Sequence, residues 1–207
     1  MISLNEFLVN KRIDKKIDQS QYKYHPTTKN ELTENIQQLL NQDIHDLNCI
    51  DTSAIKDMSY LFNYDNNYID IYDIDDIDIS KWNVGNVKNM SGMFKGCEKL
   101  NCNISDWNVS KVENMYEMFA LCNNFNCDIS NWNVSKVEDM ECMFYGCTSF
   151  NQDLNSWDVS RVEFMTRMFS GCTNFNQNLN NWNVNDMCDI DGIFDACKSL
   201  KNKPKWY

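Results

Sequence analysis

Hydrophobic residues recur along this chain with a period of 25 residues. Tryptophan marks the period, at positions 82, 107, 132, 157 and 182. The unit that begins at Trp107 carries the apolar columns Val109, Val112, Met115, Met118, Phe119, Cys122, Phe125 and Ile129, and its neighbours repeat them. A fixed period of this length predicts stacked units, because one short unit cannot bury its own apolar face.

Two apolar spacings coexist inside each unit. From Val112 to Cys122 the apolar positions are three and four residues apart, which predicts one face of a helix of about three turns. Trp132 and Val134 lie two apart, which predicts a short strand. The sequence therefore predicts an α/β solenoid of about six 25-residue units, each with a short helix, a turn and a short strand. Each tryptophan N–H needs an acceptor in such a core.

The residues before the repeats predict an N-terminal cap. Residues 1–48 lie outside the period, and "TKNELTENIQQLL" predicts an amphipathic helix in which Thr28 and Glu31 have capping-box spacing. The apolar face of this helix is Leu32, Ile36, Leu39 and Leu40. Residues 49–207 are assigned to the solenoid, with a degenerate first repeat, an acidic insert at 63–80, five regular repeats from Trp82 and a short C-terminal cap.

The repeat consensus is W-[ND]-V-S-x-V-x-x-M-x-x-M-F-x-x-C-x-x-F-N-x-[DN]-[IL], as in "WNVSKVENMYEMFALCNNFNCDI". Over about Ile50 to Trp206 it resembles the BspA-like bacterial leucine-rich-repeat family, which is common in mycoplasmas. The resemblance implies a right-handed leucine-rich-repeat-like solenoid with a concave strand face. The better-known members are surface adhesins, so a surface adhesin is one alternative for the function.

Charge and hydropathy narrow the partner class. The formal net charge of −11 argues against binding to nucleic acid or to anionic membranes, because phosphate affinity comes from Lys and Arg. The same charge permits a protein partner with a basic surface. No apolar run approaches a membrane span, and "MISLNEFLVNKRIDKK" lacks the pattern of a secretion signal. We expect a cytoplasmic protein, in the host cytoplasm if it is phage-encoded.

Catalytic chemistry is not expected. His25 and His45 both lie outside the repeats, and no Gly-rich phosphate loop or G-x-S-x-G motif occurs. We therefore predict no enzyme, cofactor or metal site. Of the ten cysteines, those at 97, 122, 147, 172 and 197 continue the apolar face and are expected in the core. Cys102, Cys127, Cys142 and Cys188 lie off this column and are expected to be more exposed.

The acidic insert leaves two interpretations open. Residues 49–81 hold eight aspartates against two lysines. The stretch "DIYDIDDIDIS" is either a strand with isoleucine inward and aspartate outward, or a contact surface for a basic partner. The carboxylates concerned are Asp70, Asp73, Asp75, Asp76 and Asp78. The second interpretation gives another alternative for the function. The protein would be an acidic inhibitor, encoded by a phage or mobile element, that blocks a nucleic-acid-handling defence enzyme by imitating nucleic acid.

Variable positions on the predicted helices are where specificity would reside. The residues concerned are Tyr116, Glu138, Glu141, Phe164 and Arg167. Tyr116 and Phe164 interrupt polar columns, and exposed aromatic residues are favoured interface anchors. The sequence thus predicts a non-enzymatic module that binds a protein through one solenoid face, and leaves the partner and the oligomeric state open.

Overall fold

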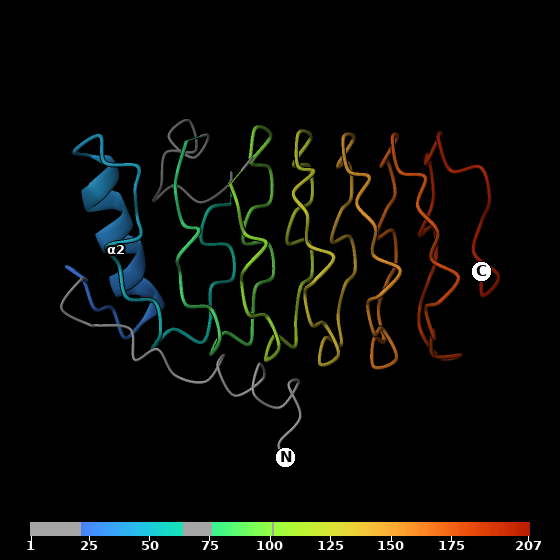
Figure 1. The fold of residues 1–207 in the computed structure, drawn as a ribbon, viewed down its shortest axis with the longest axis horizontal. Coiled ribbons are helices and arrows are strands. Elements are labelled where there is room, and N and C mark those ends of the chain that lie inside the picture. The colour runs from blue at the N-terminus through green and yellow to red at the C-terminus, as the bar shows by residue number, and fades with distance from the viewer. Residues whose placement is uncertain (1–21, 64–75, 101) are drawn as a thin grey trace, which may run out of the picture.

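The computed structural model describes residues 22–63, 76–100 and 102–207. They form a row of coils stacked in chain order, with helix α2 at one end and the C-terminal coil at the other (Figure 1). Isolated parallel bridges join equivalent positions of successive coils: Asp57 to Asn89, then Asn114, Asp139, Phe164 and Asp189. The period of the sequence is therefore the period of the stack.

Helix α2 (Lys29–Leu40) confirms the predicted amphipathic helix. Thr28 and Glu31 form the expected capping box, since each side chain accepts a backbone N–H bond from the other residue. The buried residues of α2 are Leu32, Ile36, Leu39 and Leu40. The Lys29 ammonium donates to the Ser59 hydroxyl at 2.9 Å, so α2 contacts the first coil of the repeats.

Each coil contains an eight-residue stretch, which we call the ladder segment, that pairs with the same stretch of the next coil. The ladder segments are 89–96, 114–121, 139–146, 164–171 and 189–196, preceded by 57–63 of the first coil. The N–H groups of the second, fourth, sixth and eighth residues donate to carbonyls of the first, third, fifth and seventh residues of the next segment. From Met115, Glu117, Phe119 and Leu121 these N···O distances are 2.6–2.9 Å.

The predicted α/β leucine-rich-repeat solenoid is wrong, because the described repeats contain no helix and no strand longer than a single bridge. The fourth and eighth residues of the ladder segments have left-handed backbone, as at Glu117 (φ 51°) and Leu121 (φ 63°). Such residues end a right-handed helix after three or four residues. The apolar spacing that suggested a helix comes instead from short turns. In one of them the Met118 N–H donates a hydrogen bond to the Met115 carbonyl at 3.1 Å.

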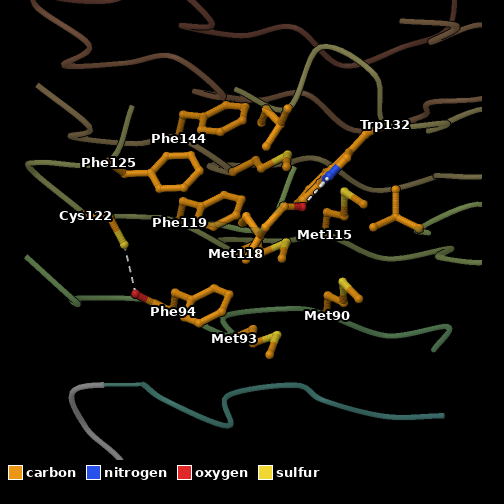
Figure 2. Packing of buried hydrophobic residues seen from close by; sticks show 14 of the residues in the cluster. Met90, Met93, Phe94, Met115, Met118, Phe119, Cys122, Phe125, Trp132 and Phe144 are labelled. Carbon is orange, nitrogen blue, oxygen red and sulfur yellow. Dashed lines mark hydrogen bonds between the residues drawn. The ribbon is translucent and has the colours of Figure 1, made fainter. Parts of the chain in front are cut away.

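Aromatic columns run through the core along the stack. The rings of Phe94, Phe119, Phe144 and Phe169 stack at centroid distances of 5.6–5.8 Å with interplanar angles of 5–12°. Figure 2 shows the first three of these rings. All four side chains are fully buried. Because each coil presents the same ring to its neighbour, an identical sequence packs well on either side, which accounts for the near-identity of the repeats.

The cysteine column is part of this core, as predicted. The Cys122 thiol donates to the Phe94 carbonyl at 2.9 Å in the preceding coil (Figure 2), and complete burial raises its pKa well above the ordinary value. Cys197 in the last coil is half-buried. The expectation for the other cysteines is only partly right: Cys127, Cys142 and Cys188 are half-buried, but Cys102 is buried in the same core.

Candidate functional site

The outward side of the ladder segments forms one continuous surface, which we call the ladder face. In the segment 114–121, Met115, Met118 and Phe119 are fully buried, while Tyr116 is half-buried and Leu121 exposed. The four hydrogen bonds between neighbouring segments fix each side chain at the same place in every coil. Coils paired in this way are about 4.8 Å apart, so the ladder face is a rigid scaffold for side chains.

Phe164 interrupts a column that otherwise stabilises the turns. At the first position of the ladder segment, the Asn or Asp side chain accepts the N–H bond of the residue two positions later, at 2.8–3.1 Å. The residues that do so are Asp57, Asn89, Asn114, Asp139 and Asp189. Phe164 cannot make this bond, and its side chain is 46% exposed.

Two tyrosines, Tyr60 and Tyr116, lie on the ladder face two coils apart. A Cβ at Gly92 would lie 2.3 Å from Cε1 of Tyr60, so the absence of a side chain there lets the Tyr60 ring lie over the second coil. The Gly92 N–H in turn donates to the Tyr116 carbonyl at 2.7 Å. Burial, together with the charges of Glu117 and Glu141, raises the pKa of the Tyr116 phenol to about 12. Tyr116 is therefore a protonated phenol in acidic surroundings.

Leu121 and Tyr145 add a second apolar pair. They are 43% and 40% exposed, and the Leu121 N–H donates to the Tyr145 carbonyl at 2.6 Å. A Cβ at Gly146 would lie 2.8 Å from Cδ2 of Leu121, so this side chain also rests on a glycine of the next coil. Tyr60, Leu121 and Tyr145 were not among the predicted site residues, although Leu121 and Tyr145 stand in columns that hold smaller or polar residues in the other coils.

Charges on and beside the ladder face are partly paired between coils. Lys95 contacts Glu117 at 2.7 Å, and Arg161 contacts Glu138 at 3.7 Å. Burial raises the pKa of Asp139 above its usual value. This carboxyl and Glu141 belong to the coil between the ladder segments of Tyr116 and Phe164. The surface between the two aromatic residues is therefore acidic.

The structure brings together only some of the predicted site residues. Tyr116, Glu141, Phe164 and Arg167 lie on ladder segments, and Glu138 lies one residue before the segment 139–146. Arg167 is exposed and has left-handed backbone (φ 54°), so it does not occupy the predicted helix.

Residues 76–80, the described end of the acidic insert, lie outside the ladder segments. Asp76 and Asp78 are exposed, while Ile77 and Ile79 are buried, which is the predicted alternation. Asp78 forms a bridge with Asp46, and hydrogen bonds from Ser80 lower the pKa of the Asp78 carboxyl. This position is four residues before Trp82 and is not part of a ladder segment. Asp70, Asp73 and Asp75 lie outside the described residues.

Membrane-spanning helices and metal sites are both absent from the part of the chain that the structure describes. No helix there has the length and hydropathy needed to cross a bilayer. In the same residues no three His, Cys, Asp or Glu side chains gather closely enough to hold a metal ion.

Comparison with known proteins identifies a family. No curated protein and no solved structure matches the chain. The family described as "Mycoplasma protein of unknown function, DUF285" matches residues 28–136 and 106–207. This match supports a mycoplasma-type repeat and does not extend to the BspA-like leucine-rich-repeat family. The overlapping matches span most of the sequence, and the chain belongs to this repeat family of unknown function.

Proposed function

We propose that this protein is a non-enzymatic module that binds a partner protein through the ladder face. Phe164 is the observation that carries the proposal. The other coils place Asn or Asp at this position and gain a local hydrogen bond, whereas this coil exposes an aromatic ring. The lost hydrogen bond and the exposed aromatic ring both reduce the stability of the fold. Residues that depart from the stabilising pattern of a fold are often required for function.

The surroundings of Phe164 suggest the chemistry of the partner. The ladder segments of Tyr116 and Phe164 are two coils apart, about 10 Å along the stack at the usual spacing of paired backbones. Asp139 and Glu141 belong to the coil between them. Aromatic anchors near charged groups are typical of the centre of a protein interface. The matching surface would carry apolar side chains that cover the two rings and a Lys or Arg between them.

The test is a pull-down from a mycoplasma lysate with the tagged full chain, read by quantitative mass spectrometry. Phe164→Asn restores the Asn of the column and should stabilise the fold by roughly 0.5–1.5 kcal/mol, while it removes the anchor. We expect this variant to recover at least tenfold less of a specific partner than the wild type does. Met187→Asn is the matched control, because Met187 is 88% exposed but lies outside the ladder segments.

Other outcomes would change the proposal. A partner retained equally by wild type and Phe164→Asn would contradict binding through the ladder face. If that partner handles nucleic acid and is released by salt from both, the acidic-inhibitor alternative would be favoured, since surface charge pairs are screened by salt. Recovery of the protein at the outside of intact cells would favour the adhesin alternative.

A further inference from the structure

A cavity of about 270 Å³ lies between residues 176–180 of one coil and residues 201–204 of the coil that follows it. Its polar lining is Asn176, Gln177, Asn178, Asn180, Lys201 and Asn202. Leu179 and Pro204 supply the apolar part of the lining. The volume approaches that of small-molecule sites, which begin at roughly 300 Å³. None of the lining residues belongs to a ladder segment, so this cavity is separate from the ladder face.

A departure from the repeat leaves this space unfilled. Gln152 and Gln177 each donate from Nε2 to a backbone carbonyl of the preceding coil at 2.8 Å. Asn202 takes the same place in the column, but its side chain is one methylene shorter and is exposed, and it makes no such bond within the described residues. The coil is also one residue shorter, since Trp206 follows Trp182 by 24 residues instead of 25. Less chain therefore fills the gap between the two coils.

Three asparagines of the lining have amino groups left for a ligand. Oδ1 of Asn176 accepts the Lys201 N–H at 3.0 Å, and Oδ1 of Asn180 accepts the Lys205 N–H at 2.9 Å. Oδ1 of Asn178 accepts the Asn180 N–H at 2.9 Å. A backbone N–H can only donate, so these bonds fix which end of each amide is the oxygen. Within the described residues none of the three Nδ2 groups has an acceptor, and a ligand that fits them supplies acceptors.

Lysine side chains make the surroundings of the cavity positive, in a chain whose net charge is −11. Lys198, Lys201, Lys203 and Lys205 are exposed, and none of them forms an ion pair with another described residue. An ammonium and three amide amino groups together suit an oxyanion, which accepts charge-assisted hydrogen bonds.

Gln177 adds one acceptor to these donors. Its Nε2 is engaged with the Asn151 carbonyl at 2.8 Å and with Oδ1 of the same residue at 3.0 Å, which leaves Oε1 to accept from a ligand hydroxyl. We propose that the cavity binds a small hydroxylated anion. Its phosphate or carboxylate group lies among Lys201 and the asparagine amino groups, and its carbon chain contacts Leu179 and Pro204.

Titration of the full chain, followed by NMR, tests this proposal. The probes are glycerol 3-phosphate and glycerate, which carry a phosphate and a carboxylate on similar three-carbon chains, and glycerol is the neutral control. The Nδ2 resonances of Asn176, Asn178 and Asn180 should shift together and saturate by about 10 mM with at least one anion. Glycerol should leave them unchanged. The stronger of the two anions identifies which acidic group the cavity prefers.

Three variants locate the binding. Asn202→Gln keeps the charge but fills the space and can bond the Asn176 carbonyl as the other glutamines do in their coils, so it should weaken binding at least tenfold without lowering the urea midpoint. Lys201→Met should weaken binding to a similar extent. Lys203→Met is the control, because it removes the same charge from outside the lining.

Several results would overturn the proposal. These are no saturation with either anion, equal shifts with glycerol, or full affinity in Asn202→Gln. Equal losses in Lys201→Met and Lys203→Met would also overturn it, since they would indicate attraction to surface charge alone. Phe164→Asn, which tests the ladder face, should leave anion affinity unchanged, so this proposal and the proposed function can fail independently.

Discussion

The indole Nε1 of Trp132 donates a hydrogen bond of 3.2 Å to the carbonyl oxygen of Ile104, 28 residues earlier in the preceding coil. The other five tryptophans make the same bond, to Leu47, Ile79, Ile129, Leu154 and Leu179. Each bond joins two coils and gives the indole N–H an acceptor; five of the six bonds are buried, and that of Trp206 is partly buried. The tryptophan column therefore stabilises the stack both by ring packing and by hydrogen bonds between coils.

Replacing Trp132 with phenylalanine should therefore destabilise the fold beyond the loss of ring volume. The Ile104 carbonyl would keep the bond from the Trp107 N–H but lose the one from the indole, which we expect to lower the free energy of unfolding by about 0.5–1.5 kcal/mol. Urea denaturation measures this loss. Trp206→Phe is the control, because Trp206 is half-buried at the end of the stack and water can replace its bond. Equal losses at both positions would contradict this account.

Arg167 offers a test of the left-handed backbone. Asn tolerates positive φ, whereas a β-branched residue does not. Arg167→Asn should change stability by less than about 0.5 kcal/mol, while Arg167→Val should lower it by about 1–2 kcal/mol. In a helix Asn and Val would behave alike. The same pair at Arg161, which has no positive φ, should differ little, and urea midpoints of the four variants decide between a turn and a helix.

Deleting one whole unit, Trp132 to Ser156, should leave a folded protein. Phe119 would meet Phe169 in place of Phe144, and Leu121 would rest on Gly171, which has the same left-handed backbone as Gly146 (φ 79° and 72°). Neighbouring surfaces would therefore stay complementary. Circular dichroism and a cooperative urea transition are the measurements. A five-residue insertion after Met115 should abolish the transition, because it shifts every ladder bond of that coil.

Acid should weaken the fold through the aspartates that accept turn bonds. Asp158 accepts bonds from the Ser160 N–H at 3.1 Å and from its hydroxyl at 2.6 Å, and these bonds lower the pKa of Asp158. A depressed carboxyl pKa contributes stability above the unfolded value, near 3.9, and that contribution is lost as pH falls through the lower folded value.

The pH test compares urea midpoints between pH 7 and pH 2.5. Asp158→Asn should show a smaller drop across this range than the wild type, because the amide does not titrate. Ser160→Ala should reduce the drop in part, since it removes the hydroxyl donor but keeps the N–H donor. If the urea midpoint of Asp158→Asn fell more steeply with acid than that of the wild type, Asp158 would not be the source of the acid sensitivity.

The secondary structure of the repeat was mispredicted for a local reason. Apolar residues three and four apart are typical of a helix, but they also arise from turns closed by bonds three residues apart, as at Met115–Met118. The positions of the glycines indicate the correct backbone conformation. Five of the six occupy the fourth or eighth place of a ladder segment, where all have positive φ. A glycine recurring inside a predicted helix argues for a left-handed position there.

The candidate site was found in part. Tyr116 and Phe164 were recognisable because they break polar columns, and the structure places both on the ladder face. Leu121 and Tyr145 could not be assigned to that face while the segment was taken for a helix, since their outward direction follows from the turns.

The sequence by itself determined the period, the composition of the core and the capping helix. Covalent order sets which residue recurs every 25 positions, and burial of identical apolar columns requires the units to stack. Only the tertiary structure decided where the backbone hydrogen bonds go. Left-handed residues such as Glu117 and Leu121 turn their N–H groups toward the neighbouring coil, and that choice between local and inter-coil pairing depends on a neighbour that no single repeat contains.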